Sequence, residues 1–98
     1  MIVPLSLEEQ LAIEQAHLIS KNPLRIKSLP AKEKRKVHLF ELAARSFEPD
    51  RIYTEAEVNE ILIPIFEDYV MLRRYLIDYQ YLKRNPSGSQ YQRVLETD

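Results

Sequence analysis

The sequence predicts a mainly α-helical fold with a small antiparallel β-sheet, and the clearest evidence lies within residues 52–94. Thr54 and Glu57 match a capping box, in which a hydroxyl and a carboxylate each accept a backbone N–H, so a helix should begin directly after Thr54. Asp68 is a typical N-cap for a second helix. Residues 85–88 place proline and glycine where a type I turn needs them, which predicts a β-hairpin. Helix, tight turn, helix and hairpin together predict a winged-helix-like fold.

The two helices of this block should differ in length. Pro64 denies the first helix another regular turn, so that helix should be short. Along the second helix, apolar residues recur at spacings of three and four and should face the core: Tyr69, Leu72, Leu76 and Tyr79.

An extra helix should precede this block near the N-terminus. Ser6 and Glu9 form another capping-box pattern, and we expect a helix over residues 7–20, ending before Pro23. Its apolar stripe consists of Leu7, Leu11 and Leu18, with Ala12 and Ile19. Packing on its own domain is the more common role for such a stripe; the alternative is a homodimer in which the stripe meets a second chain.

The middle of the chain should supply the central core element. Leu24 and Ile26 alternate with basic residues, which indicates an extended segment. Residues 32–47 form the most regular helical pattern, with Val37, Phe40, Ala44 and Phe47 on one face. Residues 48–50 should end that helix, and residues 51–53 can add a short strand to the hairpin. We therefore expect an N-terminal helix and linker over residues 1–23 and a winged-helix-like domain over residues 24–98, within one compact unit.

Length and composition restrict the possible classes of protein. The 98 residues carry a net charge of −1 and no cysteine, which excludes a disulfide framework and the usual structural zinc sites. No apolar run approaches the ~20 residues of a membrane span, and no signal-peptide pattern opens the chain, so we expect a cytoplasmic protein without a membrane partner. The charge is uneven, because residues 21–36 are strongly basic and residues 48–68 strongly acidic.

The residues indicate no catalytic, cofactor-binding or metal-binding site. His17 and His38 fall on different predicted helices, and the single glycine, Gly88, cannot form a glycine-rich phosphate loop. We therefore expect a protein that is not an enzyme and uses no cofactor. Most of the six tyrosines lie on or beside the second helix and the hairpin, where core packing is the stronger interpretation and base stacking the weaker one.

Seven basic residues are the candidates for contact with double-stranded DNA. They are Arg74 on the second helix of the block, Lys83, Arg84 and Arg93 on the hairpin, and Lys34, Arg35 and Lys36 at the start of the central helix. Arg73 borders the packed face and could instead pair with Glu57 or Glu60. Glu67 and Asp68 oppose DNA binding, because they precede the would-be recognition helix and repel phosphate.

Several sequence blocks resemble a bacterial family of domains of unknown function. The blocks are residues 29–32, 47–49, 53–62 and 68–79, followed by Gly88 and Tyr91, and the resemblance covers roughly residues 24–94. Members occur alone or behind ArsR-type helix-turn-helix domains in transcription regulators. The resemblance implies a winged-helix-like fold, a regulatory setting and no catalytic residues. Gln80 stands where the family usually has glycine, and Gln92 where it usually has an aromatic residue.

Two functions from different classes follow. The favoured one is a winged-helix DNA-binding transcription regulator, supported by the fold, the resemblance and the basic residues. The alternative is a protein-interaction or oligomerisation module without DNA affinity, supported by the acidic helix start and the near-zero net charge. Its partner would be another protein or a second copy bound through Leu7, Leu11 and Leu18.

Overall fold

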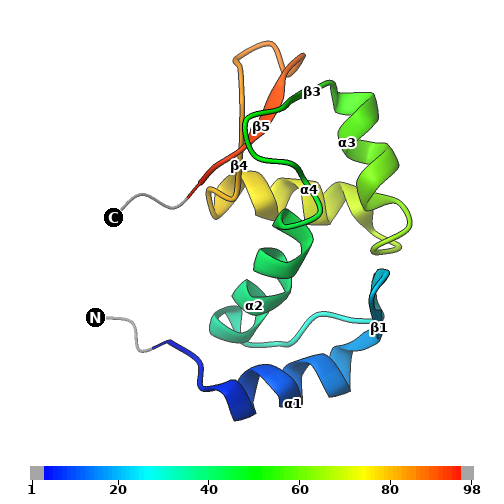
Figure 1. The fold of residues 1–98 in the computed structure, drawn as a ribbon, viewed down its shortest axis with the longest axis vertical. Coiled ribbons are helices and arrows are strands. Elements are labelled where there is room, and N and C mark those ends of the chain that lie inside the picture. Colours follow the sequence, from blue (N-terminus) through cyan, green and yellow to red (C-terminus); the bar gives the residue numbers. More distant parts are fainter. Residues whose placement is uncertain (1–3, 96–98) are drawn as a thin grey trace.

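The computed structural model describes residues 4–95, which form four helices and five short strands (Figure 1). In chain order these are α1 (Leu7–His17), β1 (Leu18–Lys21), β2 (Leu24–Ile26), α2 (Glu33–Ala44), β3 (Ile52–Tyr53), α3 (Glu55–Leu62), α4 (Tyr69–Asp78), β4 (Leu82–Arg84) and β5 (Tyr91–Arg93). Among the residues described, none of the helices is long and apolar enough to cross a bilayer.

The strands form two small antiparallel sheets. β1 pairs with β2, and β5 lies between β3 and β4 in a sheet of order β3-β5-β4. The predicted class, mainly α with a small antiparallel sheet, is confirmed, and the arrangement is consistent with a winged-helix-like fold that carries an extra N-terminal helix. The hairpin β4–β5 occupies the position of a wing, and we call it the wing below.

α4 lies across the middle of the molecule, with α3 and the wing on one side and α2 and α1 on the other (Figure 1). The core is continuous across this arrangement. Leu39, Phe40 and Ala43 of α2 are fully buried, as are Leu72 and Leu76 of α4. α2 is therefore the central core element that its sequence predicted, although it ends at Ala44 rather than at residue 47 and continues only as turns.

The local signals of the second half are confirmed. Thr54 Oγ1 accepts from Glu57 N at 3.1 Å, and Glu57 Oε1 accepts from Thr54 N at 2.9 Å. Asp68 caps α4 through the N–H of Met71 at 3.1 Å. In the wing turn, the Gly88 N–H donates to the Asn85 carbonyl at 3.0 Å, with Gly88 at φ +72°, where glycine lacks the steric penalty of other residues.

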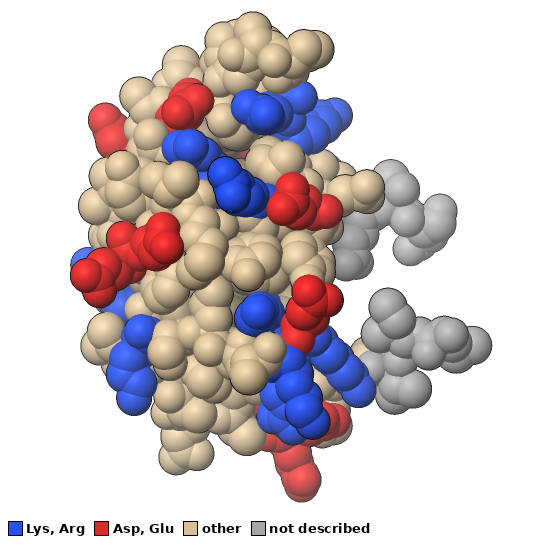
Figure 2. Space-filling model, turned by 180° about the vertical axis from the view of Figure 1, so that it is seen from behind, with Lys and Arg blue, Asp and Glu red and all other residues tan. Residues whose placement is uncertain are grey.

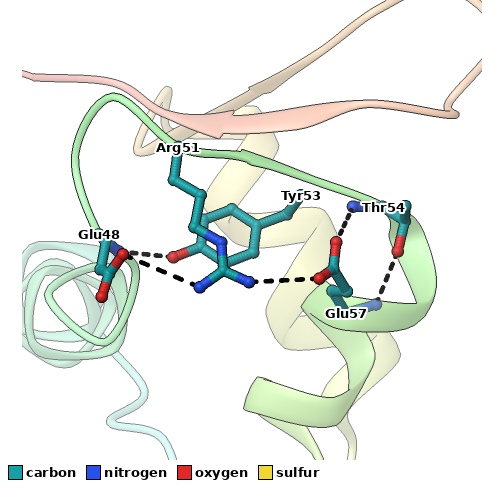
Figure 3. A network of polar contacts seen from close by, with 5 residues as sticks. All are labelled: Glu48, Arg51, Tyr53, Thr54 and Glu57. Carbon is teal, nitrogen blue, oxygen red and sulfur yellow. Dashed lines mark hydrogen bonds and ion pairs between the residues drawn. The ribbon is translucent and has the colours of Figure 1, made fainter.

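A polar network holds the end of the α2 segment against the start of α3 (Figure 3). The Tyr53 hydroxyl accepts from Glu48 N at 2.7 Å, and Arg51 lies over the Tyr53 ring, 4.7 Å from its centroid. Arg51 also reaches Glu57 at 3.3 Å. Because Glu57 completes the α3 cap as well, one carboxylate serves both the cap and the connection between helices.

The prediction for the N-terminal segment is wrong in two respects. The helix ends at His17, not at residue 20, because Leu18–Lys21 pairs as β1 with β2 instead of continuing the helix. The helix face that packs inward carries Ile13, which is 2% exposed, whereas Leu7 and Leu11 are 69% and 52% exposed. The expected stripe therefore does not exist as one helical face, and residues 18–21 are strand rather than helix or linker.

Gln80 ends α4 in the left-handed conformation, with φ +64°. The Tyr81 N–H donates to the Leu76 carbonyl at 2.8 Å and the Gln80 N–H to the Ile77 carbonyl at 3.0 Å, which together make a Schellman motif. Glycine is the usual residue at this position, because it adopts positive φ without steric cost. The glutamine noted in the sequence thus occupies a site with a clear preference for glycine.

Candidate nucleic-acid interface

A cavity of about 280 Å³ lies between α4, the wing and the start of α3. We call it the α4–wing groove. Two of the predicted DNA-contacting residues line it from different elements, Arg74 on α4 and Arg84 on β4. The remaining lining residues are Glu55, Val70, Arg73, Ile77, Asp78 and Tyr91.

Helix periodicity and strand register explain why these two arginines converge. Leu72 and Leu76 turn into the core, which directs Arg74 outward between them. In the wing, Arg84 lies directly opposite Tyr91, and residues opposite each other share one face of the sheet. Because Tyr91 is buried, Arg84 lies on the face of the hairpin that is turned toward α4.

Arg74 and Arg84 are exposed, and within residues 4–95 neither side chain forms a hydrogen bond or an ion pair. Both guanidinium groups can therefore contact an anion without first giving up a protein partner. Asp78 follows Arg74 by one helical turn and lines the same groove, so the groove carries both signs of charge.

Arg73 is engaged by α3 and is not available in the same way. Its Nη1 donates to Asn59 Oδ1 at 2.6 Å and lies 3.5 Å from Glu55 Oε1. The prediction that Arg73 pairs with Glu57 or Glu60 is wrong. Its partners nevertheless lie on the preceding helix, as expected. The Tyr91 hydroxyl also reaches Glu55, at 3.4 Å, so Glu55 joins α3, α4 and the wing.

The two other wing candidates lie outside the α4–wing groove. Lys83 is paired with Gln92 and points to the opposite face of the hairpin, beside a smaller cavity of about 240 Å³ that Arg84 also lines. Arg93 is half-buried and donates from Nη1 to the Phe47 carbonyl at 3.0 Å. Arg93 therefore holds the wing to the segment after α2.

Lys34, Arg35 and Lys36 lie in the first turns of α2, toward α1 and away from the wing (Figure 1). The hydrogen bond from the Ser6 N–H is the main reason that the pKa of Glu9 lies below its ordinary value, and Lys34 and Arg35 lower this pKa further. Lys36 Nζ lies 5.5 Å from the centroid of the Tyr75 ring on α4. Figure 2 shows basic and acidic side chains interspersed over one face of the molecule.

The tyrosines near α4 contribute to packing. Tyr75 stacks on Phe40 with ring centroids 5.0 Å apart, and Tyr79 lies 5.2 Å from Phe40. Burial of its hydroxyl, together with the nearby Glu33, raises the pKa of Tyr79. These contacts join α4 to α2 and support the core-packing interpretation over base stacking.

The two histidines also have structural contacts. His17 Nδ1 lies 2.9 Å from Ser28 Oγ, and His38 Nε2 lies 2.6 Å from Glu14 Oε2. Within the described part of the chain, no group of three or more His, Cys, Asp or Glu side chains could hold a metal ion.

The site contains residues that sequence reasoning did not connect with it. Glu55 and Tyr91 line the groove beside Arg74 and Arg84, yet they come from the start of α3 and from β5. Only the pairing of Tyr53 with Tyr91 and of Arg84 with Tyr91 places them there. No local pattern in the sequence encodes that register.

Comparison with known proteins identifies one family. A family model described as an uncharacterized protein conserved in bacteria (DUF2087) matches residues 25–93. Neither the curated proteins nor the solved structures contain a significant match.

Proposed function

The chain belongs to the conserved bacterial family DUF2087, and we propose that it is a non-enzymatic DNA-binding transcription regulator of winged-helix type. In this proposal α4 enters the major groove and the wing follows the sugar-phosphate backbone. The observation that carries the proposal is the convergence of Arg74 and Arg84, both exposed and without a protein partner, on the two sides of one groove.

The two arginines would have different roles. Arg84 lies near the wing tip with Lys83 beside it, and flexible cations on a hairpin suit phosphate contacts, which position a protein without reading sequence. Arg74 lies on the outer face of α4, where a guanidinium can bind guanine O6 and N7. Asp78, one turn further on, could accept a hydrogen bond from a cytosine amino group.

The charge distribution limits how tight and how general the binding can be. The net charge is −1, and Glu67 and Asp68 precede α4 at the end that usually contacts base edges in helix-turn-helix proteins. We therefore place the contacts in the second half of α4 and the wing. Lys34, Arg35 and Lys36 would add contacts only if the duplex also extends along the α2 side of the molecule.

The test is a fluorescence titration of random and genomic duplexes at ~50 mM salt, where even non-specific binders reach micromolar affinity or better. Each phosphate contact contributes about −0.9 to the slope of log affinity against log salt concentration. Replacing Lys83 and Arg84 together by glutamine should therefore flatten this slope by roughly two units. Arg74→Ala should weaken a preferred site by about 1 to 3 kcal/mol and leave random duplex almost unaffected.

Arg45→Gln is a suitable control, because Arg45 is exposed at the end of α2 and outside the α4–wing groove. It removes one positive charge and should leave the salt slope unchanged. Absence of binding by the folded wild type at low salt would refute the proposal.

A second function is favoured by a different observation. Leu7 and Leu11 on α1 are exposed apolar side chains, and the start of α4 is acidic, which suits a protein-interaction or oligomerisation module better than a DNA-binding domain. Sedimentation at tens of micromolar tests self-association. In this case Leu11→Glu should convert a dimer to a monomer without loss of helix content.

A further inference from the structure

A second and larger cavity, of about 570 Å³, lies at the start of α4. We call it the α4-start groove. One wall is the segment after β2, with Lys27, Ser28 and Leu29. The other wall is the connection between α3 and α4 and the first turn of α4, with Phe66, Glu67, Asp68 and Met71.

Both walls are held in place by hydrogen bonds. The Ile26 N–H donates to the Ile65 carbonyl at 2.7 Å, which joins the two walls at their base. The Lys27 N–H donates to the His17 carbonyl at 2.8 Å, and the His17 ring bonds the Ser28 hydroxyl. On the opposite wall, Asp68 caps Met71. The groove is therefore formed before any partner arrives, which lowers the entropic cost of binding.

The lining combines apolar surface with negative charge. Leu29, Phe66 and Met71 are half-buried and leave apolar surface open to the groove. Glu67 is exposed and has no hydrogen-bond or ion-pair partner among residues 4–95. Asp68 uses Oδ1 for the helix cap, and Lys27 is the single cation among the lining residues.

We propose that the α4-start groove binds a protein segment in which an apolar side chain stands next to a lysine or arginine. The apolar side chain would pack between Leu29, Phe66 and Met71, where the flexible thioether can adapt to its shape. The adjacent cation would pair with Glu67. The same carboxylates repel phosphate, so the groove is unsuited to nucleic acid.

This inference explains the acidic start of α4 independently of DNA binding. α4 has ten residues and spans about 15 Å. Of its residues, only Met71 lines the α4-start groove, whereas the α4–wing groove runs along the helix from Val70 to Asp78, so the two grooves share no residue. A protein bound in the α4-start groove then leaves Arg74 and Arg84 free.

The test uses the full chain labelled with ¹⁵N and a capped peptide, Gly-Ser-Lys-Leu-Arg-Ser-Gly, followed by amide chemical shifts. A single anchor and two charges should give a dissociation constant on the order of 0.1 to 1 mM. Saturable shifts are expected at residues 27–29 and 66–71, with the amides of residues 84–91 unaffected. Replacing leucine by serine, or both basic residues by glutamate, should abolish them.

Glu67→Lys should weaken binding of the basic peptide at least about fivefold, since it converts attraction at the rim to repulsion. Glu60→Lys is the matched control, because Glu60 is an exposed acidic residue of α3 outside this groove, and it should leave the affinity unchanged. Shifts at other residues, equal binding of the glutamate peptide, or no saturation at millimolar peptide would each overturn the proposal. Shifts of the same amides on raising the protein concentration alone would also overturn it, because the occupant would then be a second copy.

Discussion

Ile13→Ala tests whether α1 is an integral part of the fold. Ile13 is 2% exposed and belongs to the same core cluster as Ile26 and Leu39. The substitution removes three buried carbon atoms at about 0.8 kcal/mol each, which gives about 2.4 kcal/mol before any cavity cost. We therefore expect a loss of about 2 to 4 kcal/mol in the free energy of unfolding, measured by urea denaturation. With a slope of about 2 kcal/mol per molar, in the middle of the usual range for a small domain in urea, the midpoint should fall by about 1 to 2 M.

Leu11→Ala is the matched control on the same helix, because Leu11 is 52% exposed. It should change the free energy of unfolding by less than about 0.5 kcal/mol in the monomer. An effect of Leu11→Ala as large as that of Ile13→Ala, at every protein concentration, would refute this assignment of the packed face. An effect that appears only at high protein concentration would instead indicate that Leu11 lies in an interface between two copies.

Three further substitutions test local features of the fold. Thr54→Ala removes the side-chain cap of α3 and should destabilise the protein by about 1 kcal/mol, measured by chemical denaturation. Gln80→Gly removes the steric cost of positive φ at the end of α4 and should raise stability by up to about 1 kcal/mol in the same assay. Glu14→Gln should destabilise by about 1 to 3 kcal/mol near pH 7, because it breaks the contacts with His38 and Lys21.

The last of these substitutions has a defined pH dependence. Burial opposes ionisation of Glu14, but the hydrogen bonds from His38 and Lys21 outweigh it, so the pKa of Glu14 lies below its ordinary value. A carboxylate with a lowered pKa stabilises the folded state above the pKa of the unfolded chain and loses this effect as acid protonates it. The stability difference between wild type and Glu14→Gln should therefore shrink as the pH falls below about 4.

Each of these predictions has a control and a refuting outcome. Thr54→Ser retains the hydroxyl and should behave like wild type, and an unchanged midpoint for Thr54→Ala would contradict the role of the cap. Gln80→Ala retains a Cβ and should not stabilise the protein. Equal gains in stability for alanine and glycine would therefore contradict a steric cost of positive φ at this position. Glu8→Gln changes an exposed carboxylate on α1 and should leave the stability unchanged. A loss of stability as large as that of Glu14→Gln would show that the contacts of Glu14 do not cause the effect.

Features that depend on neighbours in sequence were predictable from the chain alone. The Thr54 cap, the Asp68 cap and the turn at residues 85–88 depend on contacts within four residues, and all three are confirmed. The buried face of α4 followed equally from the spacing of Leu72 and Leu76, because helical periodicity determines which side chains share a face. The family resemblance, expected over roughly residues 24–94, is matched by the family model over residues 25–93.

Tertiary structure alone decided the features that join distant segments. Helical and extended conformations compete at Leu18, and pairing with Ile26 in β2 selects the strand, which no local signal reports. Strand register likewise directs Arg84 toward α4 and Lys83 away from it. The grouping of Arg74 with Arg84 depends on this register. A shift of one residue would move each side chain to the opposite face, so long-range backbone pairing, not residue type, determines the composition of the candidate site.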